Sequence, residues 1–206
     1  MGIFSKKTID GKYLQAVAMA DVDGDIIDLD NMTKALPVIE YSHHEVHGGS
    51  SFSASANNVD LDTDDTLIIA FKTSDTMKHL HMVATMKNTS TSYAEILEAP
   101  TITNGTGSEI SPTNRNRNSL KESTVSSIEA SPVVNEVSIN PTITADGTII
   151  EPEYIGVGKN KGSSESRSLT EIILKQNTIY AFRITGLEDN GNATVKLVWY
   201  EHTTPE

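Results

Sequence analysis

Five of the six histidines fall in two clusters that could hold a metal ion. They are His43, His44 and His47 in the first cluster and His79 and His81 in the second. Because alternate residues of a strand point the same way, we expect His79 and His81 to share a face. His44 or His47 could then complete a three-histidine site if their strand were a neighbour. The alternative, which we favour, is that the imidazoles are hydrogen-bonded to the backbone or to Glu45 and Glu98. A pH-sensitive subunit contact is a third option.

Two acidic runs could bind calcium through carboxylate oxygens. They are Asp21, Asp23, Asp25, Asp28 and Asp30 in the first, and Asp60, Asp62, Asp64 and Asp65 in the second. The first run fails the EF-hand pattern, because Ile26 stands where the glycine belongs and Met32 where the glutamate belongs. The second lies where a turn between strands is needed. We therefore predict solvated acidic loops, and neither a metal nor another cofactor.

Covalent catalysis has no support in the sequence. There is no cysteine, no G-x-S-x-G elbow and no phosphate-binding loop. Arg115 and Arg117, in an Asn-Arg-Asn-Arg-Asn segment, could bind phosphate or carboxylate groups. We favour hydrogen bonds from Arg117 between strands or between subunits, so both arginines are interface candidates. We predict that the chain is not an enzyme.

The composition favours a β-rich protein that binds other proteins. The net charge of -12 would repel a phosphate backbone, which argues against a nucleic-acid partner. No apolar run approaches the roughly 20 residues of a membrane span, and the N-terminus carries no apolar signal region. A hydrophobic content of 37% is lean for a chain of 206 residues, so remaining apolar surface would be buried against partner subunits. We expect a homo-oligomer.

The end of the chain carries most of the expected core. Tyr180, Phe182 and Ile184 alternate with other residues, as in a half-buried strand, and Val195, Leu197 and Trp199 do the same. Asn190-Gly191 lies between the two runs and favours a tight turn. We predict a terminal hairpin over residues 172–202, with both apolar sets on one buried face and packed against the run Leu67 to Phe71.

The rest of the chain predicts an N-terminal arm and one β domain. Residues 1–40 have too little apolar content to fold alone and are read as an extended arm. From Tyr41 to the end, residues 41–206, short strands alternate with turns, and Thr66–Lys72 reads as a strand buried on both faces. Two polar loops, 111–140 and 156–168, are expected to contact partners. The predicted fold is an all-β, antiparallel, jelly-roll-like β-sandwich.

The chain contains several short sequence segments whose order and spacing, taken together, are specific. They are His47-x-Gly49-x-x-Phe52, His79-Leu80, Glu98-Ala99-Pro100-Thr101, Asn116-Arg117-Asn118-Ser119, Pro141-Thr142 with Gly147-Thr148, Ile173-Leu174-Lys175 with Asn177-Thr178-x-Tyr180-x-x-Arg183-x-Thr185, and Trp199-Tyr200-Glu201-His202. With these pieces, Tyr41 to His202 resembles the virion structural proteins of tailed bacteriophages that are head-associated accessory or decoration proteins. The chain departs from them in its N-terminal arm and in extra residues over Val125 to Ser138.

The resemblance implies a β-sandwich without catalysis that functions through assembly, and it brings no active-site residues. We therefore expect a capsid decoration, or cement, protein in the virion, assembled in the host cytoplasm, with the major capsid protein or other virion proteins as partners. A tail or head-tail connector component is the near alternative. A carbohydrate-binding or adhesive β-sandwich would instead display aromatic side chains, for which Tyr13, Tyr154 and Tyr200 are the candidates. A metal-dependent enzyme built on His79 and His81 is the third alternative.

Overall fold

The structure is a computed structural model, and it describes residues 4–9, 12–17, 41–76, 78–129, 131–156, 164–167 and 171–203. The chain divides into two units, 1–40 and 41–206. In the first unit, β1 (Phe4–Ile9) and β2 (Lys12–Val17) form an antiparallel hairpin. The acidic run 21–30 and the side chain of Tyr13 lie outside what the structure describes.

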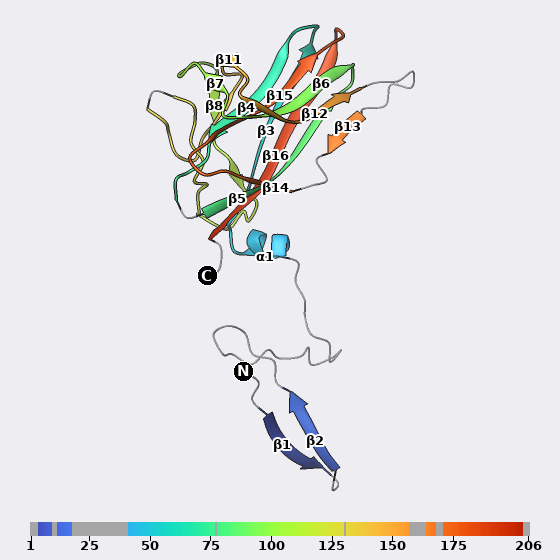
Figure 1. The fold of residues 1–206 in the computed structure, drawn as a ribbon, viewed down its shortest axis with the longest axis vertical. Helices are drawn as coiled ribbons and strands as arrows, with labels where there is room; N and C mark the ends of the chain where they lie inside the picture. Colours follow the sequence, from blue (N-terminus) through green and yellow to red (C-terminus); the bar gives the residue numbers. More distant parts are fainter. Residues whose placement is uncertain are drawn as a thin grey trace. The chain divides into compact units, whose positions relative to one another are not determined.

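The second unit is an antiparallel β-sandwich, which confirms the predicted fold class (Figure 1). One short helix, α1 (Tyr41–His47), precedes the strands. The strands are β3 (Ser51–Leu61), β4 (Thr66–Lys72), β5 (Lys78–Asn88), β6 (Ser92–Glu98), β7 (Thr101–Ile102), β8 (Ser108–Ile110), β9 (Thr113–Asn114), β10 (Val137–Ile139), β11 (Ile143–Ala145), β12 (Thr148–Ile155), β13 (Ser164–Arg167), β14 (Ile172–Leu174), β15 (Ile179–Gly186) and β16 (Gly191–Thr203).

Two six-stranded sheets make the layers. One has the order β12-β6-β15-β4-β10-β8, and the other has β13-β5-β16-β3-β9 with β14 also paired to β5. Consecutive strands β3, β4, β5 and β6 therefore alternate between the sheets, as in a jelly roll. A small third sheet pairs β7 with β11, so the two similar Pro-Thr-Ile-Thr segments of the sequence lie against each other.

Aromatic rings from both sheets fill the space between the layers. Phe71 on β4 stacks with Phe182 on β15 at 6.0 Å between ring centroids, and with Trp199 on β16 at 6.2 Å. The prediction that the Leu67 to Phe71 run packs against the terminal aromatic residues is confirmed. Both faces of β4 are buried, since Ile68 and Ala70 belong to a second apolar cluster on the outer side of its sheet.

The predicted terminal hairpin is wrong, because β15 and β16 belong to different sheets. Asn190 does adopt a positive φ of 60° in the turn. However, the Asn190 N–H donates to Asp62 Oδ1 at 3.0 Å, and the Gly186 N–H donates to the carbonyl of Asp65 at 2.9 Å. These bonds attach the turn between β15 and β16 to the turn between β3 and β4, so the chain passes from one sheet to the other there. The two apolar sets meet face to face across the sandwich.

The prediction of β structure from Tyr41 onward is wrong for residues 41–47, which form α1. Gly48 and Gly49 end this helix: Gly49 has a φ of 71°, and the Ser50 N–H donates to the carbonyl of Glu45 at 2.9 Å. A glycine with positive φ and a bond that spans five residues are the signs of a Schellman C-cap. The strand begins just after it, with β3. No helix in the described residues is long and apolar enough to span a membrane.

Candidate functional site

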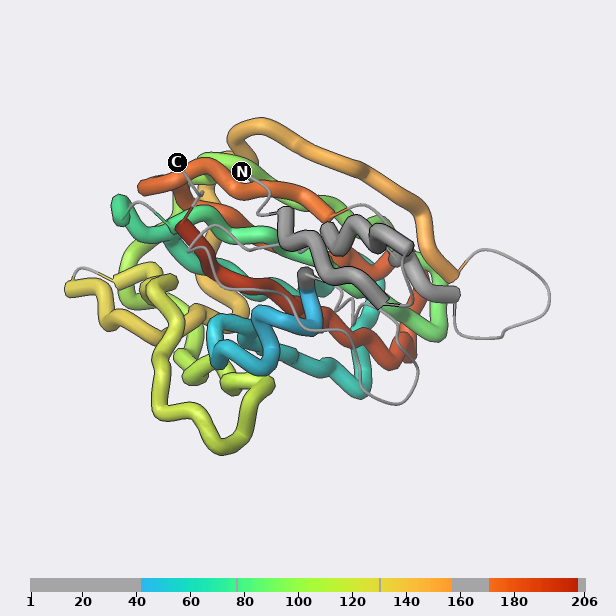
Figure 2. The backbone as a smooth tube through the Cα atoms, turned by 90° about the horizontal axis from the view of Figure 1, so that it is seen from below, coloured from blue at the N-terminus to red at the C-terminus, as the bar shows by residue number. Residues whose placement is uncertain are grey.

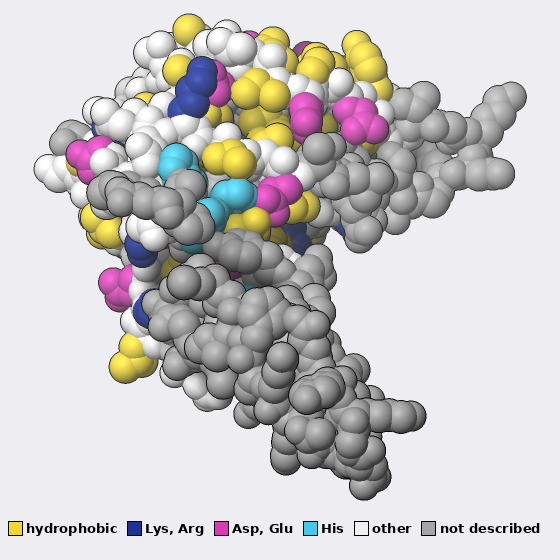
Figure 3. Space-filling model, turned by 60° about the horizontal axis from the view of Figure 1, so that its bottom comes forward, with side chains coloured by type: hydrophobic (Ala, Val, Ile, Leu, Met, Phe, Trp, Pro, Cys, Tyr) yellow, Lys and Arg dark blue, Asp and Glu magenta, His cyan; other side chains and the backbone are white. Residues whose placement is uncertain are grey.

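A cluster of hydrogen-bonded rings lies on the outer face of the sheet that contains β5 and β16. His81 Nδ1 lies 2.5 Å from Glu171 Oε1, and Tyr200 donates its hydroxyl to the same oxygen at 2.8 Å. His202 Nε2 lies 2.7 Å from His81 Nε2. The rings of His81 and Tyr200 stack at 4.6 Å. Figure 3 shows the histidine side chains gathered on one face.

The geometry of this cluster does not suit a metal ion. Two nitrogens that share a hydrogen bond point at each other, so they cannot both direct lone pairs at one ion. In the described part of the chain, no three histidine, aspartate or glutamate side chains converge on a metal site. His79 pairs across the strands with His202, on the face that carries His81. The cluster instead couples β5, β16 and the segment before β14.

His44 and His47 lie on α1 and not on a strand, so the arrangement proposed for a three-histidine site is wrong. His47 Nε2 lies 2.9 Å from His43 Nε2, one helical turn away. His44 Nδ1 lies 3.7 Å from Glu45 Oε1, close enough for an ion pair if the imidazole is protonated but longer than the expected hydrogen bond. All three histidines of the helix are exposed, and the carbonyl of His47 accepts from Asn116 in the polar loop that follows β9.

Glu98, the other glutamate expected near the histidines, has different partners. Lys175 Nζ donates to Glu98 Oε1 at 2.6 Å, and the Tyr180 hydroxyl donates to Oε2 at 2.7 Å. The hydrogen bond from Lys175, followed by that from Tyr180, lowers the pKa of Glu98. Burial, reinforced by the bond to Glu98, raises the pKa of Tyr180. These groups hold the end of β6 to β15.

A buried carboxylate helps to fix the loop 111–140 to the sandwich. Glu201 on β16 is only 2% exposed, and its Oε1 accepts the hydroxyl of Ser123 at 2.6 Å and the indole N–H of Trp199 at 3.1 Å. The backbone N–H of Thr124 donates to Oε1 at 3.0 Å, and the Thr124 hydroxyl donates to Oε2 at 2.7 Å. Each carboxylate oxygen therefore has donors, which is what a buried carboxylate requires.

Apolar side chains from the same loop enter the core beside this carboxylate. Val125 and Val137 are buried in the main core, and Ile128 is buried in the second apolar cluster on the outer side of the β4 sheet. Ser126 exchanges backbone hydrogen bonds with Lys72 on β4, at 2.9 and 3.0 Å. The loop is therefore built into the fold, although its polar composition predicted a surface excursion.

Large apolar side chains on this fixed loop nevertheless face the solvent. Leu120 is 98% exposed and Val134 is 63% exposed, and Val133 is also exposed. Leu120 lies close to the start of β3: Lys121 Nζ donates to the carbonyl of Gly48 at 2.8 Å. Figure 2 shows this part of the loop beside α1. Because the core anchors this loop, it presents Leu120 to the solvent without having to be ordered on binding.

Both interface candidates in the basic segment are exposed on this loop. Arg115 donates through NH1 to Ser51 Oγ at 3.1 Å, and its N–H donates to the Ser51 carbonyl at 2.9 Å, so it links β9 to β3. Arg117 donates to the carbonyl of Asn114 at 3.3 Å, within the loop. The interstrand contact expected of Arg117 is therefore made by Arg115. Asn116 Nδ2 donates to the carbonyl of His47 at 2.9 Å and fixes the segment to α1.

Tyr154 is 65% exposed on the edge strand β12, and its ring lies 5.0 Å from that of Tyr93. Tyr200 lies in the opposite sheet, stacked on His81, so these two tyrosines do not form one aromatic platform. Tyr13 lies on β2, and its side chain is outside the described residues. The arrangement expected of a sugar-binding surface is not present between Tyr154 and Tyr200.

A partly buried ion-pair network on the outer side of the other sheet was not predicted. Arg183 on β15 donates through Nε and NH2 to Glu95 Oε1 at 2.8 and 2.6 Å, and through NH1 to Asp146 Oδ1 at 2.8 Å. Burial acts to lower the pKa of Arg183, but the hydrogen bonds to Asp146 and Glu95 outweigh it and the pKa is raised. The network holds the β11–β12 turn to β6 and β15.

Carboxylates also crowd together near the β8–β10 edge. Burial, followed by the hydrogen bond and charge of Glu129 and the charge of Glu136, raises the pKa of Glu109. Glu109 lies opposite Ser138 in the strand register. The raised pKa means that the folded protein holds a proton here more readily than the unfolded chain.

Comparison with known proteins gives no relative. No family model matches the chain, and neither the curated proteins nor the solved structures include a match. The functional assignment therefore rests on structural features.

The roles of Glu201 and Arg183 were not predicted from the sequence. Each interrupts an otherwise apolar or β-branched strand, and a charge within such a strand is the signal that could have identified them.

Proposed function

We propose that this chain is a non-enzymatic structural protein of a tailed-phage virion, and that it acts as a capsid decoration protein. The observation that carries the proposal is the fixed loop with its exposed apolar tip, Leu120. Free loops bind weakly because binding must order them. A loop already held by Glu201, Val125 and Ile128 avoids that cost, so it suits a permanent contact with another protein.

The mechanism is stabilisation by linked binding. A protein that binds across subunit boundaries adds buried area that the intact shell has and the broken shell lacks, so binding favours the intact particle. Leu120 would enter an apolar pocket of the capsid surface, with Arg115 and Arg117 available for hydrogen bonds to carboxylates at its rim. The net charge of -12 would keep the outward face soluble. The resemblance over residues 41–202 supports the same role.

The test is binding to phage heads from which the protein has been removed. Purified chain is mixed with heads of the phage that encodes it, and the bound fraction is measured by co-sedimentation. Leu120→Asp should reduce binding at least tenfold, because a charge would have to be buried in the contact. Leu187→Asp is the matched control. Leu187 is also exposed, but it follows Gly186, which packs against Asp62 at the end of β3, whereas Leu120 lies by its start.

Binding of the wild type and of Leu187→Asp, with loss in Leu120→Asp, supports the proposal. Equal binding of all three proteins would exclude the loop tip as the contact. No binding to heads would exclude the decoration role. Binding to isolated tails or connectors would transfer the protein to that part of the virion.

A further inference from the structure

The hydrogen bonds around His81 and His202 fix the number of protons that the two rings carry. His81 Nδ1 faces a carboxylate oxygen of Glu171, and His202 Nδ1 lies 3.0 Å from the backbone carbonyl of Thr203. A carboxylate and a carbonyl only accept hydrogen bonds, so each of these two nitrogens must carry a proton. The two Nε2 atoms lie 2.7 Å apart, which requires one proton between them. The four ring nitrogens therefore hold three protons.

Three protons on two imidazoles give the pair one positive charge, and Glu171 balances it. The same Glu171 oxygen also accepts the hydroxyl of Tyr200 at 2.8 Å. Because the His81 side chain is only 14% exposed, water cannot easily replace a lost hydrogen bond there. The arrangement suits this number of protons alone, since a fourth proton would set two N–H donors face to face.

Other charged groups on the neighbouring strands add to this effect. His79 lies opposite His202 in the register of β5 and β16, on the same face of the sheet. Lys78 lies opposite Thr203 at the end of the ladder. The carboxylate of Glu201 is buried and bonded to Ser123 and Thr124 in the core. In acid, this face would therefore gain positive charge beside the pair.

The helix α1 and the start of β3 adjoin the same end of β16, since the Glu201 N–H donates to the carbonyl of Ser50 at 2.9 Å. Arg115 reaches this region through its bond to Ser51, the β3 partner of Tyr200. The helix carries the buried Glu45 and three exposed histidines, His43, His44 and His47. All six histidines of the chain thus lie on α1 or at the adjoining ends of β5 and β16.

We propose that the His81–His202 pair is a pH-sensitive contact, which holds the end of β16 with three protons and opens when it takes up a fourth. Two protonated Nε2 atoms would repel each other, so the His202 ring would turn away into the solvent. His81 would keep its bond to Glu171, because a fully protonated ring strengthens that ion pair. The expected result is a looser end of β16, with the rest of the sandwich intact.

The proton count is tested by NMR on the full chain with nitrogen-labelled histidine, because the chemical shift of a ring nitrogen depends on whether it carries a proton. At about pH 7, we expect both Nδ1 atoms of the pair to be protonated and one proton to be shared by the two Nε2 atoms. Two protons, or four, on these nitrogens at that pH would overturn the proposal.

Hydrogen exchange tests the opening itself. Protection factors, corrected for the pH dependence of exchange in an unfolded chain, are compared at about pH 8 and about pH 5, the range in which imidazoles change charge. The Glu201 N–H points towards β3, so the His202 N–H points towards His79 on β5. We expect protection at His79 and His202 to fall about tenfold in acid, the equivalent of one hydrogen bond to a charged group.

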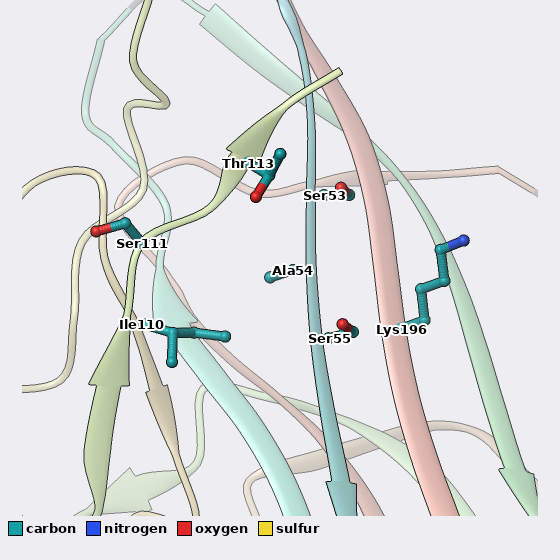
Figure 4. A pocket seen from close by; sticks show the side chains of 7 residues that line it. All are labelled: Ser53, Ala54, Ser55, Ile110, Ser111, Thr113 and Lys196. Carbon is teal, nitrogen blue, oxygen red and sulfur yellow. The ribbon is translucent and has the colours of Figure 1, made fainter. Parts of the chain in front are cut away.

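A cavity of about 210 Å³ on the same sheet provides an internal reference (Figure 4). Its lining contains neither a histidine nor a carboxylate; it consists of Ser53, Ala54, Ser55, Ile110, Ser111, Thr113 and Lys196. Ala54 pairs with Leu197, so its amide reports on β16 away from the histidines. Its protection should not change over the same pH range. An equal fall at Ala54 and His202 would mean that the whole sheet loses stability, and would overturn a local opening.

Two matched substitutions identify the sensor. In His202→Gln the amide can donate to His81 Nε2, or accept from it once that nitrogen is protonated, so the fall in protection at His79 should disappear. His44→Gln makes the same change at a histidine on α1 whose side chain is 65% exposed, and it should respond to acid like the wild type. A wild-type response in His202→Gln would overturn the proposal. If His202→Gln does not fold, the proton count in the wild type still decides.

Discussion

Replacement of Glu201 by glutamine should weaken the attachment of residues 123–126 of the loop to the sandwich. The carboxylate accepts from Ser123, Trp199 and both donors of Thr124. In glutamine an amide NH2 group replaces one carboxylate oxygen. The hydrogen bonds to that oxygen are lost, and the NH2 group, itself a donor, can face the N–H of Thr124. A hydrogen bond to a charged group contributes about 1.5 to 3 kcal/mol, so we expect a loss of about 2 kcal/mol in the free energy of unfolding. Alanine would leave these four donors without their acceptor and should cost about 4 kcal/mol.

Urea denaturation followed by Trp199 fluorescence measures this loss, and hydrogen exchange locates it. Amides near Thr124 and Ser126 should exchange faster in Glu201→Gln, while β4 and β15 remain protected. Glu122→Gln is the matched control, since Glu122 is exposed in the same loop. A Glu201→Gln variant within about 0.5 kcal/mol of the wild type, with unchanged exchange in the loop, would refute the view that this carboxylate fixes the loop.

Three further substitutions test the buried charges, each by thermal or chemical unfolding. Arg183→Met should cost about 3 kcal/mol, because it leaves the buried carboxylate of Glu95 unpaired, and adding Glu95→Leu should recover most of the loss. The pKa of Glu109 is raised, so the folded state binds its proton more tightly, and the free energy of unfolding falls as pH rises through that pKa. Glu109→Gln should therefore raise the melting temperature at neutral pH, and this gain should disappear in acid. Tyr180→Phe should cost about 1 kcal/mol at neutral pH. The pKa of Glu98 is lowered, so its carboxylate stabilises the fold at pH values above its ordinary pKa, and this stabilisation is lost as the pH falls. Tyr180→Phe removes one of the hydrogen bonds that lower the pKa and should make the loss of stability in acid smaller.

The strands and their buried faces could be predicted from the sequence because they depend on local alternation. Tyr180, Phe182 and Trp199 all lie in the core, and β4 is buried on both faces. The connection between β15 and β16 could not be predicted in the same way. Asn190-Gly191 favours a turn whether the next strand pairs in the same sheet or crosses to the other one. The crossing depends on bonds to Asp62 and Asp65, which are more than 120 residues away.

The candidate sites were less accessible to sequence reasoning because they join distant segments. The pairing of His81 with His202 and Glu171 depends on strand register, and the clusters of nearby histidines in the sequence did not show it. The helix at Tyr41–His47 removed His44 and His47 from the expected strand. The attachment of the loop 111–140 to the core could not be predicted from its polar composition, because a few buried residues and Glu201 suffice to hold it.

The most direct test of the proposed role is a cryo-electron microscopy map of the phage particle in which this chain is proposed to assemble. The account predicts density for the β-sandwich on the outside of the head, at sites that bridge neighbouring capsid subunits, with the loop that carries Leu120 against the capsid surface. A map of intact particles in which the head carries no such density, or in which this loop points into solvent, would contradict it.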